Sequence, residues 1–291
     1  MKKIVIASGK GGVGKSMLAS TLAVFFAQED QKIVACDCDV DAPNLAIWLG
    51  ETAGWQTTQK ISTIEKPTID PQKCLGCGLC VQNCQFGALK IADQRAQLDY
   101  FLCEGCGVCE LVCPQQAIRL VPVENAEIRQ LQTRYGFPLV GGQLFPGESA
   151  SGKVVSEIKN QALALAKENG SQLTLIDAPP GTGCPVIAAV QDCQLAILVT
   201  EPTPSGVADL KRVLQTIDYF QIPYQVVINK WDLSPQFTQK IEKEFAQKIL
   251  GKISYNQAIF QAIAQLQPIA ETNLSAKDEI KQIYLKLREE I

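Results

Sequence analysis

The chain has 291 residues, of which 46% are hydrophobic and 20% are charged, and its formal net charge is −3. This balance is typical of a soluble globular protein and argues against nucleic acid as the main partner. No apolar run reaches the roughly 18 residues that a membrane-spanning helix needs. The N-terminus enters a strand pattern directly, which predicts no signal peptide and a cytoplasmic location.

Two residue counts restrict the chemistry. The chain contains 12 cysteines and no histidine. Without an export signal, so many cysteines favour metal ligation over disulfide bonds. The lack of histidine excludes imidazole ligands and histidine-based acid–base catalysis. Any catalysis must therefore use carboxylates, lysines, thiolates or a metal cluster.

A phosphate-binding pattern follows the first predicted strand, Ile4–Ala7. The sequence GKGGVGKS (Gly9–Ser16) matches G-x₄-G-K-[ST] and precedes a helical stretch, as a phosphate loop requires. Lys15 would neutralise the β- and γ-phosphates, and the Ser16 hydroxyl would bind Mg²⁺. The backbone amides expected to hold phosphate oxygens belong to Gly11, Gly12, Val13, Gly14 and Lys15.

Strand and helix patterns alternate in the outer parts of the chain. Buried strands are expected at Ile4–Ala7, Ile33–Cys36, Leu173–Ile176, Leu195–Val199 and Val226–Ile228. Helices are expected at Ser16–Gln28, Lys153–Glu168, Ser205–Phe220 and Pro235–Lys248, with two more near the C-terminus. The alternation predicts an α/β fold with a doubly wound, mostly parallel sheet. The last helix has balanced charges, so we expect its apolar face to pack on the body rather than on a membrane; that face contains Ile280, Ile283, Leu287 and Ile291.

The alternation breaks between about Lys60 and Glu124, where the sequence repeats itself with an offset of 29 residues. Ile69–Ile91 aligns with Leu98–Leu120, and all four cysteines match. Both copies have the spacing C-x₂-C-x₂-C-x₃-C, which is typical of [4Fe–4S] ligands. Pairs of the form C-x₂-C also occur in zinc sites, but the matched double run favours clusters. We expect an α/β domain in two parts, 1–60 and 124–291, interrupted by a module at 61–123 with two equivalent halves.

The insert resembles bacterial two-cluster ferredoxins, in which the fourth cysteine of each run serves the other cluster. The resemblance implies an α+β module. It assigns one cluster to Cys74, Cys77, Cys80 and Cys113. It assigns the other cluster to Cys103, Cys106, Cys109 and Cys84. Gln85 follows Cys84 where that family usually has proline, so the local turn there is in question.

Lys10, directly after the first glycine of the phosphate loop, resembles the signature lysine of a deviant Walker A motif. The chain as a whole resembles P-loop ATPases of the MinD/Mrp/nitrogenase-iron-protein superfamily that carry an inserted ferredoxin domain. In that superfamily the lysine reaches across a face-to-face dimer to the partner's nucleotide, in the manner of an arginine finger. The resemblance implies a Mg²⁺-dependent ATPase, a homodimer with nucleotide at its interface, and catalytic roles for Lys10, Lys15 and Asp39.

The same resemblance assigns the carboxylates. The segment CDCDVDAPNL resembles switch I, in which Asp39 would orient the attacking water and Asp37 would support Mg²⁺, with Asp41 a weaker alternative. The segment LTLIDAPPGTGCP resembles Walker B with switch II, and Asp177 would hold Mg²⁺ through water. Mg²⁺ and ATP are therefore expected besides two [4Fe–4S] clusters.

The segment VINKWD places Asn229, Lys230 and Asp232 after a late strand. The pattern N-K-x-D alone is the guanine motif of GTPases, with the aspartate on the base. In the MinD class an asparagine at this point typically meets adenine instead. Because Lys10 points to that class, ATP is favoured over GTP, with Asn229 and Asp232 as candidate nucleotide-binding residues.

Two further features have ordinary structural interpretations. The segment Gly147–Val154 imitates a phosphate loop but lacks the Mg²⁺-binding hydroxyl, so Ser149 or Ser151 is expected to cap a helix or to contribute to a docking surface. Cys184 has the spacing of a cluster-ligating cysteine of the nitrogenase iron protein, but no partner ligand is evident. Small buried hydrophobes are expected at the remaining cysteines, Cys36, Cys38 and Cys193.

These features together predict an ATP-hydrolysing iron–sulfur protein. A nucleotide-driven dimer switch would be coupled to electron transfer through two [4Fe–4S] clusters to an unidentified redox or acceptor protein. The alternatives are a cluster carrier and a MinD/ParA-like positioning or regulatory ATPase with redox-sensing clusters. The Mrp-type carriers typically use a C-terminal C-x-x-C, and no such pair follows Cys113.

Overall fold

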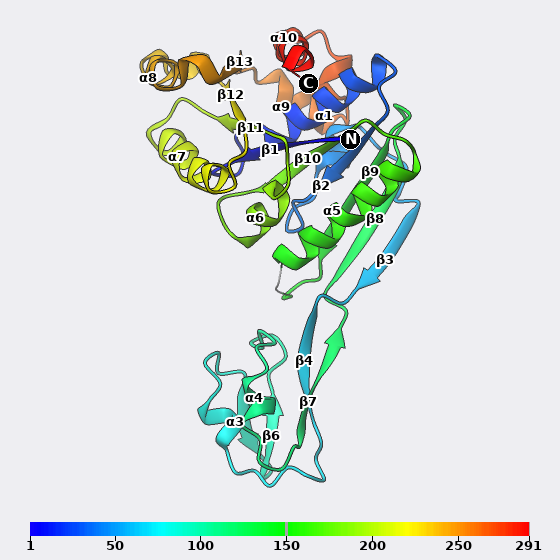
Figure 1. Ribbon diagram of the computed structural model, residues 1–291, viewed down its shortest axis with the longest axis vertical. Coiled ribbons are helices and arrows are strands. Elements are labelled where there is room, and N and C mark those ends of the chain that lie inside the picture. Colours follow the sequence, from blue (N-terminus) through cyan, green and yellow to red (C-terminus); the bar gives the residue numbers. More distant parts are fainter. Residues whose placement is uncertain (149–150, 291) are drawn as a thin grey trace. The chain divides into compact units, whose positions relative to one another are not determined.

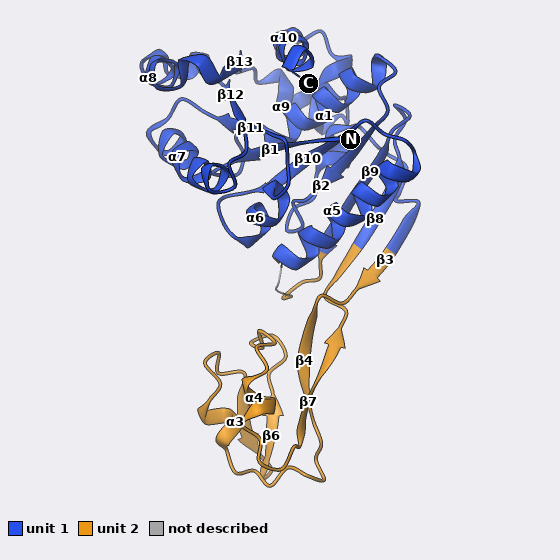
Figure 2. Ribbon diagram, in the orientation of Figure 1, with its two compact units in different colours: residues 1–58, 128–143, 151–291 blue, residues 59–127, 144–150 orange. Residues whose placement is uncertain are grey.

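The computed structural model describes residues 1–148 and 151–290. These residues form two compact units, which are coloured separately in Figure 2. Unit 1 comprises residues 1–58, 128–143 and the chain from 151 onward, whereas unit 2 comprises residues 59–127 and the segment that starts at 144.

A sheet with nine strands in the described part of the chain forms the framework of unit 1 (Figure 1). Its six pairings from β13 to β9 are parallel. In spatial order the strands are β13 (Ile249–Ile253), β12 (Tyr224–Asn229), β11 (Leu195–Thr200), β1 (Lys2–Ser8), β10 (Leu173–Pro180), β2 (Ile33–Asp37), β9 (Pro138–Leu144), β8 (Ala126–Gln132) and β3 (Thr57–Ile61). The chain runs from β1 towards one edge and later towards the other, which is the doubly wound arrangement that the sequence predicts.

Helices cover both faces of this sheet. One face carries α1 (Lys15–Gln28) and α10 (Ser275–Glu290), and the other carries α5 (Ser151–Glu168), α6 (Cys184–Val190) and α7 (Pro204–Tyr219). The shorter elements of unit 1 are α2 (Leu45–Trp48), α8 (Pro235–Phe245), α9 (Ala258–Ala264) and the 3₁₀ turns Trp231–Leu233, Ala246–Lys248 and Ile269–Glu271.

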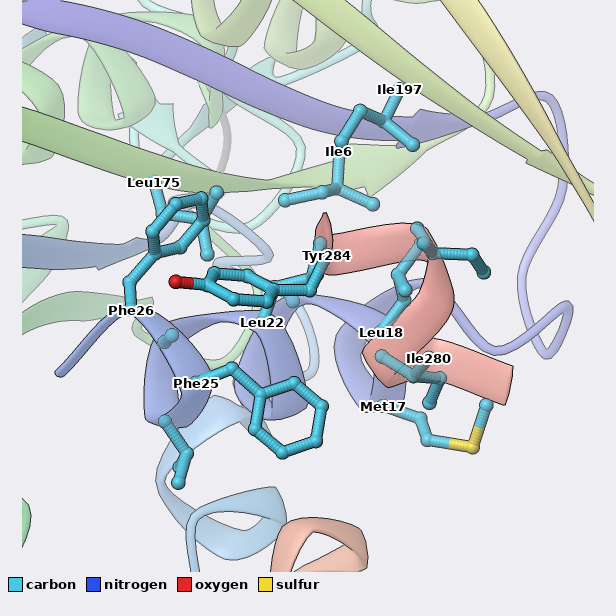
Figure 3. Packing of buried hydrophobic residues seen from close by; sticks show 14 of the residues in the cluster. Ile6, Met17, Leu18, Leu22, Phe25, Phe26, Leu175, Ile197, Ile280 and Tyr284 are labelled. Atoms are coloured by element: carbon cyan, nitrogen blue, oxygen red, sulfur yellow. The ribbon is translucent and has the colours of Figure 1, made fainter. Parts of the chain in front are cut away.

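The helix that follows the phosphate loop is buried along almost its whole length, because α10 packs beside it on the same face of the sheet (Figure 3) and α2 and the 3₁₀ turn Ile269–Glu271 also pack against it. Tyr284 of α10 lies edge-on to Phe26 of α1, with ring centroids 4.9 Å apart. Ile280, Ile283 and Leu287 are buried in the same core. The apolar face of the last helix therefore packs on the body, as predicted, and Ile291 lies outside the described residues.

The five strands predicted in the outer parts are present, each one to four residues longer than expected. Four further strands of the main sheet were not predicted: β3, β8, β9 and β13. Thr57–Ile61 is polar and mostly exposed, and β13 is interrupted by Gly251 and Lys252, so neither has a buried-strand pattern. The helix predicted at Pro235–Lys248 ends at Phe245 and continues as a 3₁₀ turn.

Unit 2 contains two antiparallel strand pairs and two single-turn helices. The strands are β4 (Ile64–Ile69), paired with β7 (Ile118–Val123), and β5 (Leu89–Ala92), paired with β6 (Arg95–Leu98). The helices are α3 (Leu79–Gln82) and α4 (Val108–Leu111). The strand before each cysteine run thus pairs with the strand after the other run. One cluster of buried residues in this unit consists of Cys80, Leu89, Ala96 and Ile118, and Ile64, Ala88 and Ala117 are also buried.

Candidate functional site

The phosphate loop joins β1 to α1 and depends on its glycines. Gly12 and Gly14 have φ values of 76° and 96°, which residues other than glycine rarely adopt. A methyl group on Gly14 would lie 2.2 Å from Nδ2 of Asn229. That nitrogen donates a 2.7 Å hydrogen bond to the Val13 carbonyl. Asn229, predicted to meet the base, therefore also fixes the shape of the loop.

Strand register brings two carboxylates to the loop. Asp177 of β10 is the direct partner of Asp37 of β2 in the parallel ladder. The Lys15 ammonium lies 3.0 Å from Oδ1 of Asp177, and their side chains are 7% and 0% exposed. Burial alone would lower the pKa of Lys15. Attraction and a hydrogen bond from Asp177, with weaker attraction from other carboxylates, raise it instead, so Lys15 is charged at neutral pH.

The second carboxylate oxygen of Asp177 is buried and has no hydrogen-bond partner. Such an oxygen calls for a cation or a water molecule. Among the described residues, no three histidine, cysteine, aspartate or glutamate side chains are grouped as they would be around one metal ion. Mg²⁺ usually keeps several waters and binds one or two carboxylates plus substrate phosphates. The orphan oxygen of Asp177, near the phosphate loop, fits that mode of binding.

Asp37 organises the loop that follows β2. Its Oδ1 accepts the backbone amide of Asp39 at 3.1 Å, and its Oδ2 accepts those of Asn44 and Leu45 at 3.0 and 2.9 Å. Burial, followed by repulsion from Asp177, raises the pKa of Asp37 to about 7. Asp37 therefore has a structural role that the sequence pattern did not reveal.

Asp39 lies closer to the space where a nucleotide would sit. It lines a cavity of about 280 Å³ together with the phosphate loop, Asn229 and Lys230. Burial raises the pKa of its carboxyl group, and its Oδ1 accepts the Ala42 amide at 3.4 Å. The cavity lies at the carboxyl ends of the parallel strands, where ligands bind in open α/β sheets.

Residues after β13 complete the cavity and were not predicted. The lining includes Ser254, Tyr255, Asn256, Ile259 and Phe260. The missed strand β13 explains this, because these residues come directly after it. Asp232, a predicted nucleotide-binding residue, is not part of the lining. Its Oδ1 accepts the Tyr255 amide at 2.7 Å, so it holds the new wall in place.

Lys10 points to a different set of partners. Its ammonium lies 2.5 Å from Oε1 of Glu201 and 3.3 Å from Oγ of Ser205. The other oxygen of Glu201 binds Lys230 at 3.2 Å, and Lys230 also donates to the Gly12 carbonyl at 3.3 Å. Burial would raise the pKa of Glu201, but its hydrogen bonds to the two lysines hold it below its usual value.

The eight repeated cysteines line two separate cavities in unit 2. One cavity is lined by Cys74, Cys77, Cys80 and Cys113, and the other by Cys84, Cys103, Cys106 and Cys109. Each set therefore takes its fourth member from the other run. Matching glycines shape the loops: a methyl group on Gly76 would lie 2.2 Å from the Gln94 carbonyl, and one on Gly105 would lie 2.3 Å from that of Glu65.

Backbone amides are directed at several of these sulfurs. The amides of Ala88, Ala96 and Ala117 donate to Sγ of Cys84, Cys74 and Cys113 at 3.3, 3.4 and 3.3 Å. All eight thiols are free of disulfide bonds. Four cysteines that line one cavity without being grouped around a single metal ion, with amides donating to some of their sulfurs, form a donor set that fits a thiolate-bound iron–sulfur cluster.

The remaining cysteines lie in unit 1. Cys36 and Cys38 are fully buried with their sulfurs 3.5 Å apart, and Cys193 is also buried, as predicted. Cys184 is exposed at the start of α6. In the segment Gly147–Val154, which resembles a phosphate loop, Ser149 lies outside the described residues and α5 begins at Ser151.

Residues 4–269 match the model of the CobQ/CobB/MinD/ParA nucleotide-binding domain. The chain belongs to this family. It is thus a nucleotide-binding P-loop ATPase of the MinD/ParA type. In the described part of this ATPase, no helix is long and apolar enough to cross a bilayer.

Known relatives of this MinD/ParA-type ATPase have different names. An uncharacterized protein of Methanocaldococcus jannaschii is 38% identical over 99% of this chain and 96% of its own. An iron-sulfur cluster carrier protein of Aquifex aeolicus is 25% identical, over 91% of this chain but 61% of its own. The septum site-determining protein MinD of Pyrococcus horikoshii, solved with Mg-ADP, shares the fold with a TM-score of 0.61 at 16% identity, over 98% of this chain and 95% of that one.

Proposed function

We propose that this ATPase couples a Mg·ATP-dependent switch to electron transfer through two [4Fe–4S] clusters. The observation that carries the proposal is the pair of cysteine-lined cavities in unit 2. When bound, the clusters would supply one-electron redox chemistry. Unit 2 is inserted in the chain between the loop that holds Asp37 and Asp39 and the strand that holds Asp177. The insertion would let the nucleotide-sensing segments act on it.

At the nucleotide site, each residue would have a separate task. The loop amides and Lys15 would bind the phosphates, and Ser16 and Asp177 would hold Mg²⁺ directly or through water. Asp39, at the cavity wall, would orient the attacking water. Asp37 would support the metal through the loop that it organises. Asn229 and the wall after β13 would face the base, with ATP as the nucleotide.

Lys10 would act across a homodimer. Its ammonium is held by Glu201 of its own chain rather than directed into its own cavity. In a face-to-face dimer it would exchange this partner for the nucleotide of the second subunit. A positive charge supplied in this way stabilises the transition state of phosphoryl transfer.

An anaerobic redox titration with EPR detection tests the coupling. Iron and sulfide content are measured first, then the midpoints of both clusters with and without Mg·ATP. A shift of at least about 60 mV, equivalent to a tenfold change in the one-electron equilibrium, is expected for the native chain but not for Lys15→Ala. Midpoints that do not change with nucleotide would contradict the proposed coupling. A protein that contains zinc instead of iron would contradict the proposed clusters.

A cluster carrier is the second candidate, because a relative with 25% identity is an iron-sulfur cluster carrier protein. The closed sets of four cysteines suit retention better than donation. Incubation with an apo-ferredoxin acceptor separates the two functions. Transfer of clusters on a timescale of minutes, accelerated by ATP, would favour the carrier over the electron-transfer protein.

A further inference from the structure

The two halves of unit 2 are related position by position, which allows their charges to be compared. The Asp70 amide donates to the Ala117 carbonyl at 2.7 Å, and the Asp99 amide donates to the Ala88 carbonyl at the same distance. The helices α3 and α4 each follow a glycine with φ near 80°. Residues 29 positions apart therefore occupy equivalent places on the backbone, and their side chains can be compared between the two cavities.

In the linings of the two cavities, one pair of equivalent residues differs in charge. Leu75 lines the first cavity, formed by Cys74, Cys77, Cys80 and Cys113, whereas its counterpart Glu104 lines the second. Both side chains are exposed. The second cavity thus has a carboxylate at its rim where the first has an aliphatic side chain.

In three further pairs, the residue in the half of the second cavity is again the more negative one. Gln94 approaches Gly76 through its carbonyl, and its counterpart Glu65 approaches Gly105 in the same way. Val81 is replaced by Glu110, whose Oε1 accepts the Leu120 amide at 3.2 Å. The third pair is Lys73 and Leu102.

Lys73 affects the comparison because its positive charge balances the negative charge of an acidic residue. Lys73 lies 3.7 Å from Asp70, whereas Leu102 offers no charge to Asp99, the counterpart of Asp70. Each half also contains a basic residue at a matching position, Arg95 and Lys66.

These basic residues do not cancel the asymmetry. Lys66 is nearly buried and forms a 2.9 Å ion pair with Glu148. Arg95 is accompanied by Asp93 in the same turn. The charges named for the first half therefore balance, and a basic residue is common to both halves at Lys90 and Arg119. Glu65, Asp99, Glu104 and Glu110 leave the second half with an excess of negative charge.

We propose that the two cysteine sets hold clusters of unequal potential, and that a single electron resides mainly on the first set. Negative charge near a cluster disfavours addition of an electron, since net charge is one determinant of the cluster potential. The electron would pass from the second cluster, which is oxidised, to the first, which is reduced, without any bond or proton change. The inference rests on the proposed function, because it requires both clusters.

The test is an anaerobic EPR titration of the full-length protein with dithionite as the one-electron reductant, without nucleotide. Two midpoints are expected, separated by at least about 59 mV, which corresponds to a tenfold preference for one cluster. Glu104→Gln should raise only the lower midpoint, and Leu75→Glu should lower only the higher one. Each should change the distribution of the electron by roughly threefold or more.

Glu124→Gln is the matched control. It removes the same charge from unit 2, but Glu124 lines neither cysteine cavity and pairs with Lys60. Neither midpoint should move. Coincident midpoints in the native protein, or Glu104→Gln acting on the higher midpoint, would overturn the inference and leave the proposed function intact. A chain without iron would overturn both the inference and the proposed function. If Leu75→Glu does not bind clusters, the isosteric Glu104→Gln variant alone tests the inference.

Discussion

The two units of this ATPase are built on different principles. Unit 1 has a core of aliphatic and aromatic side chains on both sides of a large sheet, and its candidate site is assembled at the carboxyl ends of the strands. Unit 2 has few buried apolar residues among those described, and its core cluster of four includes a cysteine. A core of that size stabilises little by burial alone. We therefore expect unit 1 to fold before it binds a ligand and, if the proposed clusters are present, unit 2 to depend on them.

Removal of an exposed cysteine gives the largest expected effect. Cys77 is exposed, and a surface side chain without a special role contributes within about 0.5 kcal/mol. As a cluster ligand its loss should be far more costly, because metal binding and folding are coupled. Cys77→Ala should lose about half of the iron and should raise hydrogen exchange throughout residues 59–127 while unit 1 stays protected.

Cys184→Ala is the control for this experiment, because Cys184 is equally exposed but lies in unit 1. It should keep its full iron content and normal exchange. If Cys77→Ala behaves like this control, unit 2 folds without clusters and the contrast between the units fails.

The next largest effect concerns the nucleotide site of unit 1. Lys10→Ala should keep nucleotide binding and lower hydrolysis by about 10³-fold or more, as loss of an arginine finger does. If the lysine acts across the dimer, a mixture of Lys10→Ala with Asp39→Ala should recover hydrolysis, because one site of the mixed dimer then has both residues. A mixture that remains as inactive as either variant would show that Lys10 acts on its own nucleotide.

Sequence patterns predicted much of both units, for different reasons. In unit 1 the phosphate loop and the strands with continuous apolar runs were evident, because burial on both faces leaves a clear pattern. The wall formed by Ser254, Tyr255 and Asn256 was not, because β13 contains a glycine and a lysine. In unit 2 the assignment of the cysteines to two sets came from resemblance, since spacing alone does not say which run supplies the fourth sulfur, and it stays a prediction. The hydrogen bonds of Asp37 and Asp232 depend on where the folded chain places these residues, so no local sequence pattern predicts them.

A pH effect is expected from a buried carboxylate at the site of unit 1. The pKa of Asp37 is raised from 3.8 to about 7, chiefly by burial. Between these values the folded protein keeps a proton that the unfolded chain has lost, so this group lowers the stability as pH rises from about 4 to 7. Thermal unfolding without nucleotide at pH 5 and pH 8 measures the effect. The loss of melting temperature at pH 8 should be smaller in Asp37→Asn than in the native chain, and equal losses would show that Asp37 ionises normally.

The smallest effect belongs to Asp232, where the sequence pattern and the site geometry differ. Its Oδ1 accepts the Tyr255 amide rather than facing the cavity, so Asp232→Ala should loosen the wall of the cavity without changing the preferred base. Loss of one such hydrogen bond costs about 1 kcal/mol, which lowers ATP affinity by roughly fivefold. Titration calorimetry with ATP and GTP measures both the affinity and the preference between the two bases. A native chain that prefers GTP, together with a variant that loses this preference, would show that Asp232 contacts the guanine edge. An unchanged preference for ATP with a modest loss of affinity is the outcome expected from a residue that holds the loop after β13 against the nucleotide.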